Sequence, residues 1–511
     1  MRGDGYITEI PYAPGYYREL SPRLIGFSLL LNGFEPPPVE GAAYLELGFG
    51  QGLSANIHAA GSAIRLYGTD LLPAHVDNAK SLATASGANA RFFDDSFEEF
   101  AKRDGLPQFD YIIVHGVWSW IGDEARRQII GILRDRLKPE GVVFISYNAL
   151  PGREAERALR ALLLLKSSSG DGARPLGERI DQGLSLARRA EEAGARFFLA
   201  YPTARRRLAR LATQSHNYLA HEFFNRDWQP SYFADVNADM SRAGLSFAGP
   251  QSPLDAIPAL NFSPEQMRLM QEIANPIDRQ SLRDFLLNTE FRRDLFVRNA
   301  RKLTQEETER RISQILLANA GADCNEDLAL TGARGRMKVA KEHLRPILDH
   351  LAQDRGIPKT IASTLASAGG TLSPAKTMEA LVLLIGSAKL SLAQSDDAIA
   401  AARPFCSALN ERLMTRALEP GAPQALASPV TGIGHPVAGI EQHFLKLYRE
   451  GVVPSSWAHA TWEQLKQRDR HLAKEGRRLE SEEKNLDVLE RHARTFAEKS
   501  LGTLKALGIA A

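Results

Sequence analysis

Cysteine, long apolar runs and excess charge are all scarce in this sequence, and each scarcity excludes a class of protein. The 511 residues contain only Cys324 and Cys406, too few for a disulfide framework or a thiolate metal site, so we expect both to be small apolar fillers in a reducing compartment. Apolar stretches such as 27–31 and 161–165 fall far short of the roughly 20 residues that span a membrane. The N-terminus lacks a signal-peptide pattern. We therefore predict a cytoplasmic protein without a membrane span.

The formal charge is nearly balanced, with 63 Lys and Arg against 61 Asp and Glu, which gives +2. Such a weak field exerts little long-range pull on nucleic acid or anionic lipid, so we expect no nucleic-acid partner and look for local sites instead. The composition, 44% hydrophobic and 24% charged, is that of an ordinary globular protein. The length suits about two to four domains.

Short apolar runs alternate with helical stretches from Ala42 to Asn148, which is typical of βα units and a parallel sheet. The expected strands are 44–47, 65–68, 90–93, 110–114 and 142–147. A further strand within 244–249 is expected to return to the same sheet, so that this first domain covers 41–255. The polar stretch 166–174 begins a helical insertion in it, at about 166–230.

Outside this α/β domain the chain is expected to be mostly helical. Residues 1–40 form a proline-punctuated N-terminal segment, 256–372 a middle domain and 373–511 a C-terminal domain, because breaks rich in glycine and proline separate the helical runs. Four leucines recur every seven residues in what reads as the last helix: Leu465, Leu472, Leu479 and Leu486. The companion positions of this stripe are charged, so a surface or capping helix is favoured over a coiled-coil zipper.

The chemistry is expected where the first strand runs into the turn Gly-Phe-Gly-Gln-Gly. Gly48, Gly50 and Gly52 leave backbone N–H groups unobstructed at a helix N-terminus, which suits a carboxylate or phosphate. A glycine turn alone is weak evidence, and the dinucleotide pattern G-x-G-x-x-G fails at Leu53. Glu46 is more informative, because a carboxylate inside an apolar strand is costly unless a cationic or hydrogen-bonding group meets it.

Acidic residues follow the next two strands. Asp70, at the end of the second strand, can accept both hydroxyls of a ribose, although it can equally cap the helix that follows. After the third strand, Ser96 and Glu99 form an S-x-x-E capping box, which leaves Asp95 available for an adenine amino group, with a structural role as the alternative. The fourth strand opens into His115-Gly-Val-Trp-Ser-Trp, at the edge where ligands bind in open α/β sheets.

In this order, the motifs resemble those of class I methyltransferases that use S-adenosylmethionine (SAM). The resemblance implies a Rossmann-like α/β fold and SAM as the cofactor. It also implies a set of cofactor-binding residues at the strand ends: Glu46, Gly48, Gly50, Gly52, Asp70, Leu71, Asp95, Ser96, His115 and Gly116. One departure is Glu140, where the family usually has a glycine in the turn before the fifth strand; this turn lies away from the ligand.

Longer segments resemble bacterial methyltransferases that carry a methyltransferase regulatory domain, a group that includes protein-lysine methyltransferases of rickettsial outer-membrane proteins. The resemblance covers roughly residues 6–300, and more loosely the segment Leu426-Ala-Ser-Pro-Val-Thr-Gly. The segments that carry it include Ile10-Pro-Tyr-Ala-Pro-Gly-Tyr-Tyr, His115-Gly-Val-Trp-Ser-Trp-Ile, Ser146-Tyr-Asn-Ala-Leu-Pro-Gly, Tyr218-Leu-Ala-His-Glu-Phe-Phe and Phe291-Arg-Arg-Asp-Leu-Phe. By this resemblance the N-terminal segment packs over the active site, the middle domain is regulatory, the substrate is a protein and the enzyme is a homodimer.

Methyl transfer from SAM requires an aligned acceptor lone pair and exclusion of water, so no metal is expected. If the acceptor is lysine, burial among aromatic groups favours the neutral amine. The candidates for this channel are Tyr16, Tyr17, His115, Trp118, Trp120, Tyr147, Asn148, His221 and Glu222. The alternative for the tryptophans is a role as core anchors. His216 and His221 lack the spacing of a zinc-binding helix, so His221 and Glu222 are interpreted as packing or substrate contacts.

The preferred function is therefore SAM-dependent methylation of lysine side chains in a protein substrate. Two alternatives stay open. One is a glycan, lipid or small-molecule acceptor, and the other is a scaffold or sensor that binds SAM without turnover.

Overall fold

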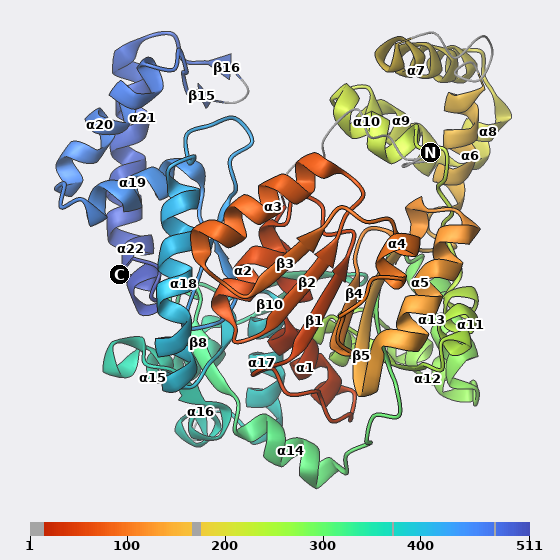
Figure 1. Ribbon diagram of the computed structural model, residues 1–511, viewed down its shortest axis with the longest axis horizontal. Coiled ribbons are helices and arrows are strands. Elements are labelled where there is room, and N and C mark those ends of the chain that lie inside the picture. Colours follow the sequence, from red (N-terminus) through yellow and green to blue (C-terminus); the bar gives the residue numbers. More distant parts are fainter. Residues whose placement is uncertain (1–14, 166–174, 370–371, 475–476, 511) are drawn as a thin grey trace.

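A seven-stranded sheet forms the centre of the computed structural model, which describes residues 15–165, 175–369, 372–474 and 477–510 (Figure 1). The strand order is β3-β2-β1-β4-β5-β7-β6. The bounds are β1 Ala43–Leu47, β2 Arg65–Thr69, β3 Ala90–Phe93, β4 Phe109–Val114, β5 Leu137–Asn148, β6 Ser246–Pro250 and β7 Phe291–Val297. Strands β1 to β5 are parallel, and β7 is antiparallel to both β5 and β6. The five expected parallel strands and the returning strand, β6, are confirmed.

Helices cover both faces of the sheet, because its central strands carry apolar side chains on both sides. Leu45 faces one layer and Tyr44 faces the other, and both are fully buried. The layer next to Leu45 consists of α4 (Phe97–Ala101), α5 (Asp123–Arg136) and α11 (Phe233–Arg242). The layer next to Tyr44 consists of α1 (Pro22–Leu31), α2 (Leu53–Gly61) and α3 (Pro73–Ser86). Such double burial is what near-continuous apolar strands predict for a parallel sheet.

The sheet domain extends past its expected end at Asp255, so that boundary is wrong. Strand β7 lies between β5 and β6 in the sheet although it follows both in the sequence. Two helices connect β6 to β7: α12 (Pro264–Glu272) and α13 (Pro276–Leu287). The error arose because the place of β7 is set by pairing with a strand about 150 residues earlier, which no local pattern records.

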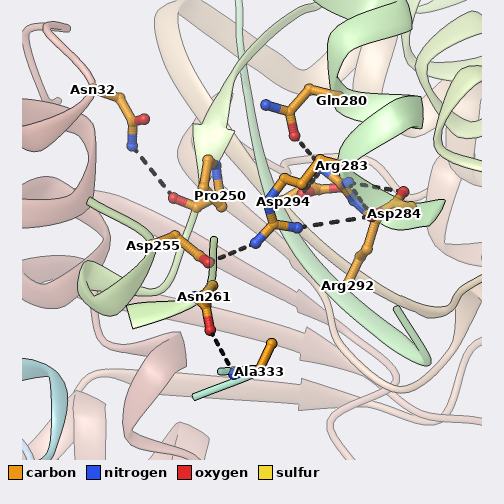
Figure 2. Close-up of polar contacts among 10 residues, drawn as sticks. All are labelled: Asn32, Pro250, Asp255, Asn261, Gln280, Arg283, Asp284, Arg292, Asp294 and Ala333. Carbon is orange, nitrogen blue, oxygen red and sulfur yellow. Dashed lines mark hydrogen bonds and ion pairs between the residues drawn. The ribbon is translucent and has the colours of Figure 1, made fainter. Parts of the chain in front are cut away.

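A buried ion network fixes α13 to this added strand (Figure 2). Arg292 on β7 donates to the carboxylates of Asp284 on α13 and Asp294 on β7, each at 2.8 Å, and all three side chains are almost completely buried. Arg283 donates to Asp255 at 2.6 Å. The charges compensate one another out of water, so removing one partner would leave an unpaired buried charge. The network therefore ties residues 255–294 to the sheet domain.

The helical insertion lies between β5 and α11 and has an apolar core of its own. It consists of α6 (Glu154–Leu164), α7 (Leu176–Glu192), α8 (Arg196–Ala200), α9 (Pro202–Leu211) and α10 (His216–Phe223). In Figure 1 these helices stand above the strand ends, on the side away from the C-terminal helices. The expected linker 166–174 lies outside the described residues.

The middle domain is built around a three-stranded antiparallel sheet, β11-β8-β12, and a hairpin, β9-β10. Its strands are β8 Leu316–Asn319, β9 Leu328–Gly332, β10 Gly335–Val339, β11 Lys359–Thr360 and β12 Leu390–Ala393. Its helices are α14 Gln305–Ser313, α15 Lys341–Ala352, α16 Ile361–Ala368 and α17 Pro374–Gly386. Because β12 pairs with β8, the expected boundary at 372/373 is wrong and this domain continues to Ala393. Helix α1 contributes Phe27 to its core.

The C-terminal domain packs against α2 and α3 of the sheet domain and shares a core with them. It contains α18 Asp396–Met414, β13 Ala425–Ala427, β14 Gly434–Pro436, α19 Gly439–Arg449, α20 Trp457–Lys466, β15 Ala473–Lys474, β16 Arg477–Arg478, α21 Glu482–Thr495 and α22 Leu501–Ala506. The four evenly spaced leucines do not lie on one helix, since α20 ends before Leu472 and α21 begins after Leu479. The expectation of one long last helix is therefore wrong, and a zipper through these leucines is excluded.

Within the described ranges, none of the helices combines the length and apolarity needed to cross a bilayer.

Candidate functional site

One cavity of about 760 Å³ opens at the C-terminal ends of the parallel strands. Turns from distant parts of the sequence meet there, because parallel strands end at the same edge of a sheet. Its wall includes one residue at or just beyond the end of each strand from β1 to β5: Gly48, Asp70, Asp95, His115 and Asn148. Of the other expected cofactor residues, Glu46, Gly50, Leu71, Ser96 and Gly116 also line it.

The glycine turn needs glycine for different reasons along its length. Gly48 has φ +75°, and a Cβ there would lie 2.4 Å from Cγ2 of Val117, so a side chain would both strain the turn and clash. Gly50 has φ +60° but open space around it. Gly52 does not line the cavity. A Cβ on Gly52 would lie 2.5 Å from Cβ of Ala79. Glycine is therefore needed here for the close packing of α2 against α3, and the expected contact of Gly52 with the ligand is not found.

Glu46 lies at the floor of this region with its side chain buried. Its Oε2 atom has no hydrogen-bond partner among the described protein groups. Burial, and then the nearby charge of Asp70, raise the pKa of Glu46 to about 8. A buried carboxyl without a partner is costly, and a cationic ligand group beside it would remove that cost. The site therefore fits a ligand that carries a positive charge close to the glycine turn.

Asp70 orders both the glycine turn and the start of α3. Its Oδ2 accepts the Gly50 N–H at 2.8 Å, and its Oδ1 accepts the Leu72 N–H at 3.1 Å and lies 3.0 Å from Nδ1 of His75. The capping role considered from the sequence is not found in that form, because the N-cap residue of α3 is Leu72 and, at this helix start, Asp70 accepts the backbone N–H of that residue rather than one inside the helix. The Asp70 carboxylate also lines the cavity.

Asp95 and Ser96 line the cavity at the end of β3. The predicted capping box is confirmed: the Glu99 N–H donates to Ser96 Oγ at 3.2 Å, and the Ser96 N–H donates to Glu99 Oε2 at 2.9 Å. Asp95 was expected to be available, but Arg103 donates to both of its carboxylate oxygens, at 2.6 and 2.8 Å. Any ligand contact of Asp95 has to be shared with this ion pair.

His115 contacts both β5 and the N-terminal segment at the cavity. Its Nδ1 lies 2.9 Å from Oγ of Ser146, which also accepts the Gly116 N–H at 3.0 Å. Its ring packs edge-on against the ring of Tyr17, with centroids 4.4 Å apart. Burial lowers the pKa of His115 to about 4, so the ring is neutral at pH 7.

The other side of the cavity holds part of the expected acceptor channel. Tyr17, Asn148, His221 and Glu222 line it together with Trp120. His221 and Glu222 come from α10, so the helical insertion supplies one wall. Burial raises the pKa of Glu222 and that of Tyr17. The surroundings on this side of the cavity therefore favour the protonated, neutral forms of Glu222 and Tyr17.

Three expected channel residues lie elsewhere, which corrects their placement. Tyr147 alternates with Ser146 and Asn148 along β5, so it points into the layer beneath the sheet, where its hydroxyl donates to Asp294 at 2.8 Å. Trp118 is fully buried in the same layer, as the core-anchor alternative predicts. Tyr16 points away from the cavity, and its hydroxyl accepts the Gly434 N–H at 2.6 Å.

Several cavity residues were missed from the sequence, most notably Glu19, Arg153 and Arg293. Glu19 Oε1 lies 3.2 Å from Nε of Arg293, so the N-terminal segment and β7 form an ion pair at the cavity wall. The run Phe291-Arg-Arg is among the segments that carry the family resemblance. Its position in the cavity follows only from the non-local pairing of β7 with β5.

No cluster of three or more His, Cys, Asp or Glu side chains suited to a metal ion occurs in the part of the chain that the structure describes. His216 Nε2 lies on the surface, 3.0 Å from Oδ1 of Asp181, whereas His221 lines the cavity. The two histidines of α10 therefore lie in different environments and do not form one site.

Comparison with known proteins identifies two segments. A methyltransferase domain family matches residues 45–141, and a family described as a predicted methyltransferase regulatory domain matches residues 215–298. An uncharacterized protein of Synechocystis sp. is 32% identical over 509 residues, covering 99% of each chain. An uncharacterized protein of Rickettsia prowazekii is 27% identical over 300 residues, which is 58% of this chain and 53% of that one. The structure of PKMT2 from Rickettsia typhi in complex with AdoHcy has the same fold, with a TM-score of 0.70 and 17% identity over 97% of this chain and 99% of that one.

Proposed function

Because the chain belongs to the SAM-dependent class I methyltransferases that carry a methyltransferase regulatory domain, we propose that it methylates lysine side chains of a protein substrate. The observation that carries the proposal is one continuous cavity. It joins the glycine turn and Glu46 on one side to Tyr17, Asn148 and Glu222 on the other. The rickettsial fold relative is itself named a PKMT, which supports the same acceptor class.

The cofactor side is assigned by the chemistry of its residues. The unpartnered Glu46 Oε2 would hold the amino group of SAM, the amides of Gly48 and Gly50 would hold its carboxylate, and Asp70 its ribose. Asp95 and Ser96 would border the adenine. When bound, SAM supplies a methyl group that is already activated on a sulfonium. The protein is left to orient the acceptor and to exclude water.

The acceptor side must take a cation and favour its neutral form. Deprotonating a lysine at pH 7 costs roughly 4 to 5 kcal/mol, from a pKa of about 10.4 at 1.36 kcal/mol per unit. Buried surroundings reduce that cost by disfavouring the ammonium. Glu222 attracts the incoming cation while it is ionised, and the Tyr17 ring and the Asn148 amide border the space in which the nitrogen of that cation loses its proton. The Glu222 carboxylate, whose pKa burial raises, is the group we assign to hold that proton.

The proposal includes a cytoplasmic location and a homodimer, and light scattering of the purified chain tests the dimer. The acceptor is tested by incubating the protein with methyl-labelled SAM and a cell-envelope extract. We expect a labelled protein band and, by mass spectrometry, methylated lysines within it. Label that survives complete protease digestion as a non-peptide product would instead identify a glycan, lipid or small-molecule acceptor. Tight SAM binding without any release of the demethylated product, S-adenosylhomocysteine (AdoHcy), would identify a sensor or scaffold.

A further inference from the structure

The short segment of residues 15–20, called the strap below, borders the cavity with every second residue. Gly15, Tyr17 and Glu19 line the cavity, whereas Tyr16 and Arg18 do not. The backbone at Tyr17 is extended, with φ −123° and ψ 98°, which turns its neighbours to the opposite side, and the chain then enters a single 3-10 turn at Arg18–Leu20. The strap therefore has an inner row of residues that faces the cavity and an outer row that faces away from it.

The inner row contacts groups that belong to the reaction site. The Tyr17 N–H donates to Ser54 Oγ at 2.9 Å, and the Tyr17 ring packs on His115. Glu19 pairs with Arg293 of β7. A shift of the strap would consequently move an aromatic wall and a charged group of the cavity together.

The outer row is held by the two accessory domains. The Tyr16 hydroxyl accepts the N–H of Gly434, which lies on β14 of the C-terminal domain. Arg18 Nη2 donates to the carbonyl oxygen of Ile385, on α17 of the middle domain, at 2.8 Å. Burial raises the pKa of Tyr16 and lowers that of Arg18, so the contacts of both polar groups matter. The Tyr16 hydroxyl also lies 3.4 Å from Nε2 of His58 on α2, a longer contact than the one to Gly434.

The fit around Tyr16 is tight on the C-terminal side. A Cβ on Gly434 would lie 2.7 Å from the Tyr16 ring, so only glycine leaves room for it. The segment just before Gly434 is docked on the end of α2, where Ser62 Oγ donates to the Gly432 carbonyl at 3.2 Å. The Gln394 amide donates to the Gly61 carbonyl at 2.8 Å. The anchor for Tyr16 is thus fixed relative to the helix that begins at the glycine turn.

We propose that Tyr16 and Arg18 are positioning residues, through which the C-terminal and middle domains hold the inner row of the strap in place against the cavity. The accessory domains then complete the methyltransferase site without lining it. This role holds for any acceptor and does not depend on the substrate being lysine.

The most direct test changes the contact between Tyr16 and Gly434 of the C-terminal domain. Gly434→Ala displaces the Tyr16 ring without changing the sequence of the strap, and Tyr16→Phe removes the hydroxyl. For both, we expect hydrogen exchange of the 15–20 peptide to speed up about tenfold or more. We expect kcat for AdoHcy release on cell-envelope extract to fall between about ten- and a hundredfold, the scale of a small misplacement. The Kd for AdoHcy should change less than threefold.

Matched controls separate this role from general destabilisation. Gly502→Ala changes a glycine of the same domain that has open space around it, and Tyr111→Phe removes a buried hydroxyl that donates to Pro37 at 2.6 Å, outside the strap. Both should leave the exchange rate of the strap and kcat unchanged. Arg18→Lys keeps a donor for Ile385 and should retain most of the kcat that Arg18→Met loses.

The proposal is overturned if the strap peptide exchanges at the same rate in Gly434→Ala, Tyr16→Phe and the wild type. It is equally overturned if Arg18→Lys is as impaired as Arg18→Met, or if the controls lose as much kcat as the anchor variants. The exchange and binding measurements need no acceptor, so this result is distinguishable from failure to find a methylated lysine.

Discussion

At the scale of single residues, Glu46 carries the strongest chemical signal. It is buried, its Oε2 lacks a partner among the described groups, and its pKa is raised to about 8. We predict that Glu46→Gln, which keeps the shape and removes the charge, weakens AdoHcy binding by about 1.5–3 kcal/mol, or roughly ten- to a hundredfold. Calorimetric titration measures this change. An affinity within twofold of the wild type would remove Glu46 from the cofactor site.

The same group makes binding depend on pH. With a pKa of about 8 in the free protein, Glu46 is mostly protonated at pH 6, and a bound ammonium favours the ionised form. Affinity for AdoHcy should therefore rise between pH 6 and 7.5, by up to about tenfold per pH unit, because the amino group of the ligand stays protonated over this range. Glu46→Gln should lack this slope, and an equal slope in both proteins would contradict the assignment.

The site residues that could be predicted from the sequence are those whose role depends on neighbouring residues in the chain. A glycine turn, a strand-end acid and a capping box are each encoded within a few neighbouring positions, and Gly48, Asp70 and Ser96 lie at the cavity as expected. Tyr16 and Tyr147 were misplaced because their aromatic character says nothing about direction. Their side of the chain depends on the partners Gly434 and Asp294, which are distant in sequence.

At the scale of elements, the start of β5 offers a stability test that should leave the chemistry unchanged. Glu140, the fourth residue of this strand, has φ +62°, in the left-handed region, and is exposed at the end opposite the cavity. Holding a residue other than glycine in the left-handed region destabilises the fold by about 1–2 kcal/mol. Glycine avoids this strain but makes the unfolded chain more flexible, which offsets part of the gain. We predict that Glu140→Gly raises the unfolding free energy by up to about 1 kcal/mol at unchanged kcat. Denaturant unfolding checks this, and a destabilised variant would contradict it.

For the ion network that attaches α13 to β7, we predict a loss of stability. Asp284→Ala leaves Arg292 with one carboxylate fewer in a fully buried setting, which should cost about 3–5 kcal/mol. Asp278→Ala, on the same helix but exposed, is the matched control and should change stability by less than about 0.5 kcal/mol. Equal melting temperatures for the two variants would show that the network contributes little.

At the scale of the whole molecule, the methyltransferase domain and its neighbours do not have separate cores. Leu53 and Ile57 of α2, and Leu82 of α3, are buried against the C-terminal domain. We predict that a chain ending at Gln394 exposes these residues, binds the dye ANS and loses AdoHcy binding. A truncated chain that melts cooperatively and binds AdoHcy like the full chain would contradict this dependence.

The sheet was predictable from sequence and the domain boundaries were not, for one physical reason. Each βα unit is encoded locally by an apolar run and a turn, so β1 to β5 could be read in order. Strands β7 and β12 belong to sheets through pairing with strands far away in sequence, and both boundaries drawn near them were wrong. The leucine spacing failed likewise, because it spans breaks between separate elements.

The central claim is that the cavity at the tips of β1 and β2 holds the adenosyl cofactor of this methyltransferase. Calorimetric titration of the full chain with AdoHcy, repeated on Asp70→Asn, tests it most directly. We predict one site per chain in the wild type and at least about a tenfold loss of affinity in the variant, since a charged hydrogen bond is replaced by a neutral one. Absence of binding heat in the wild type, or equal affinities for both proteins, would contradict it.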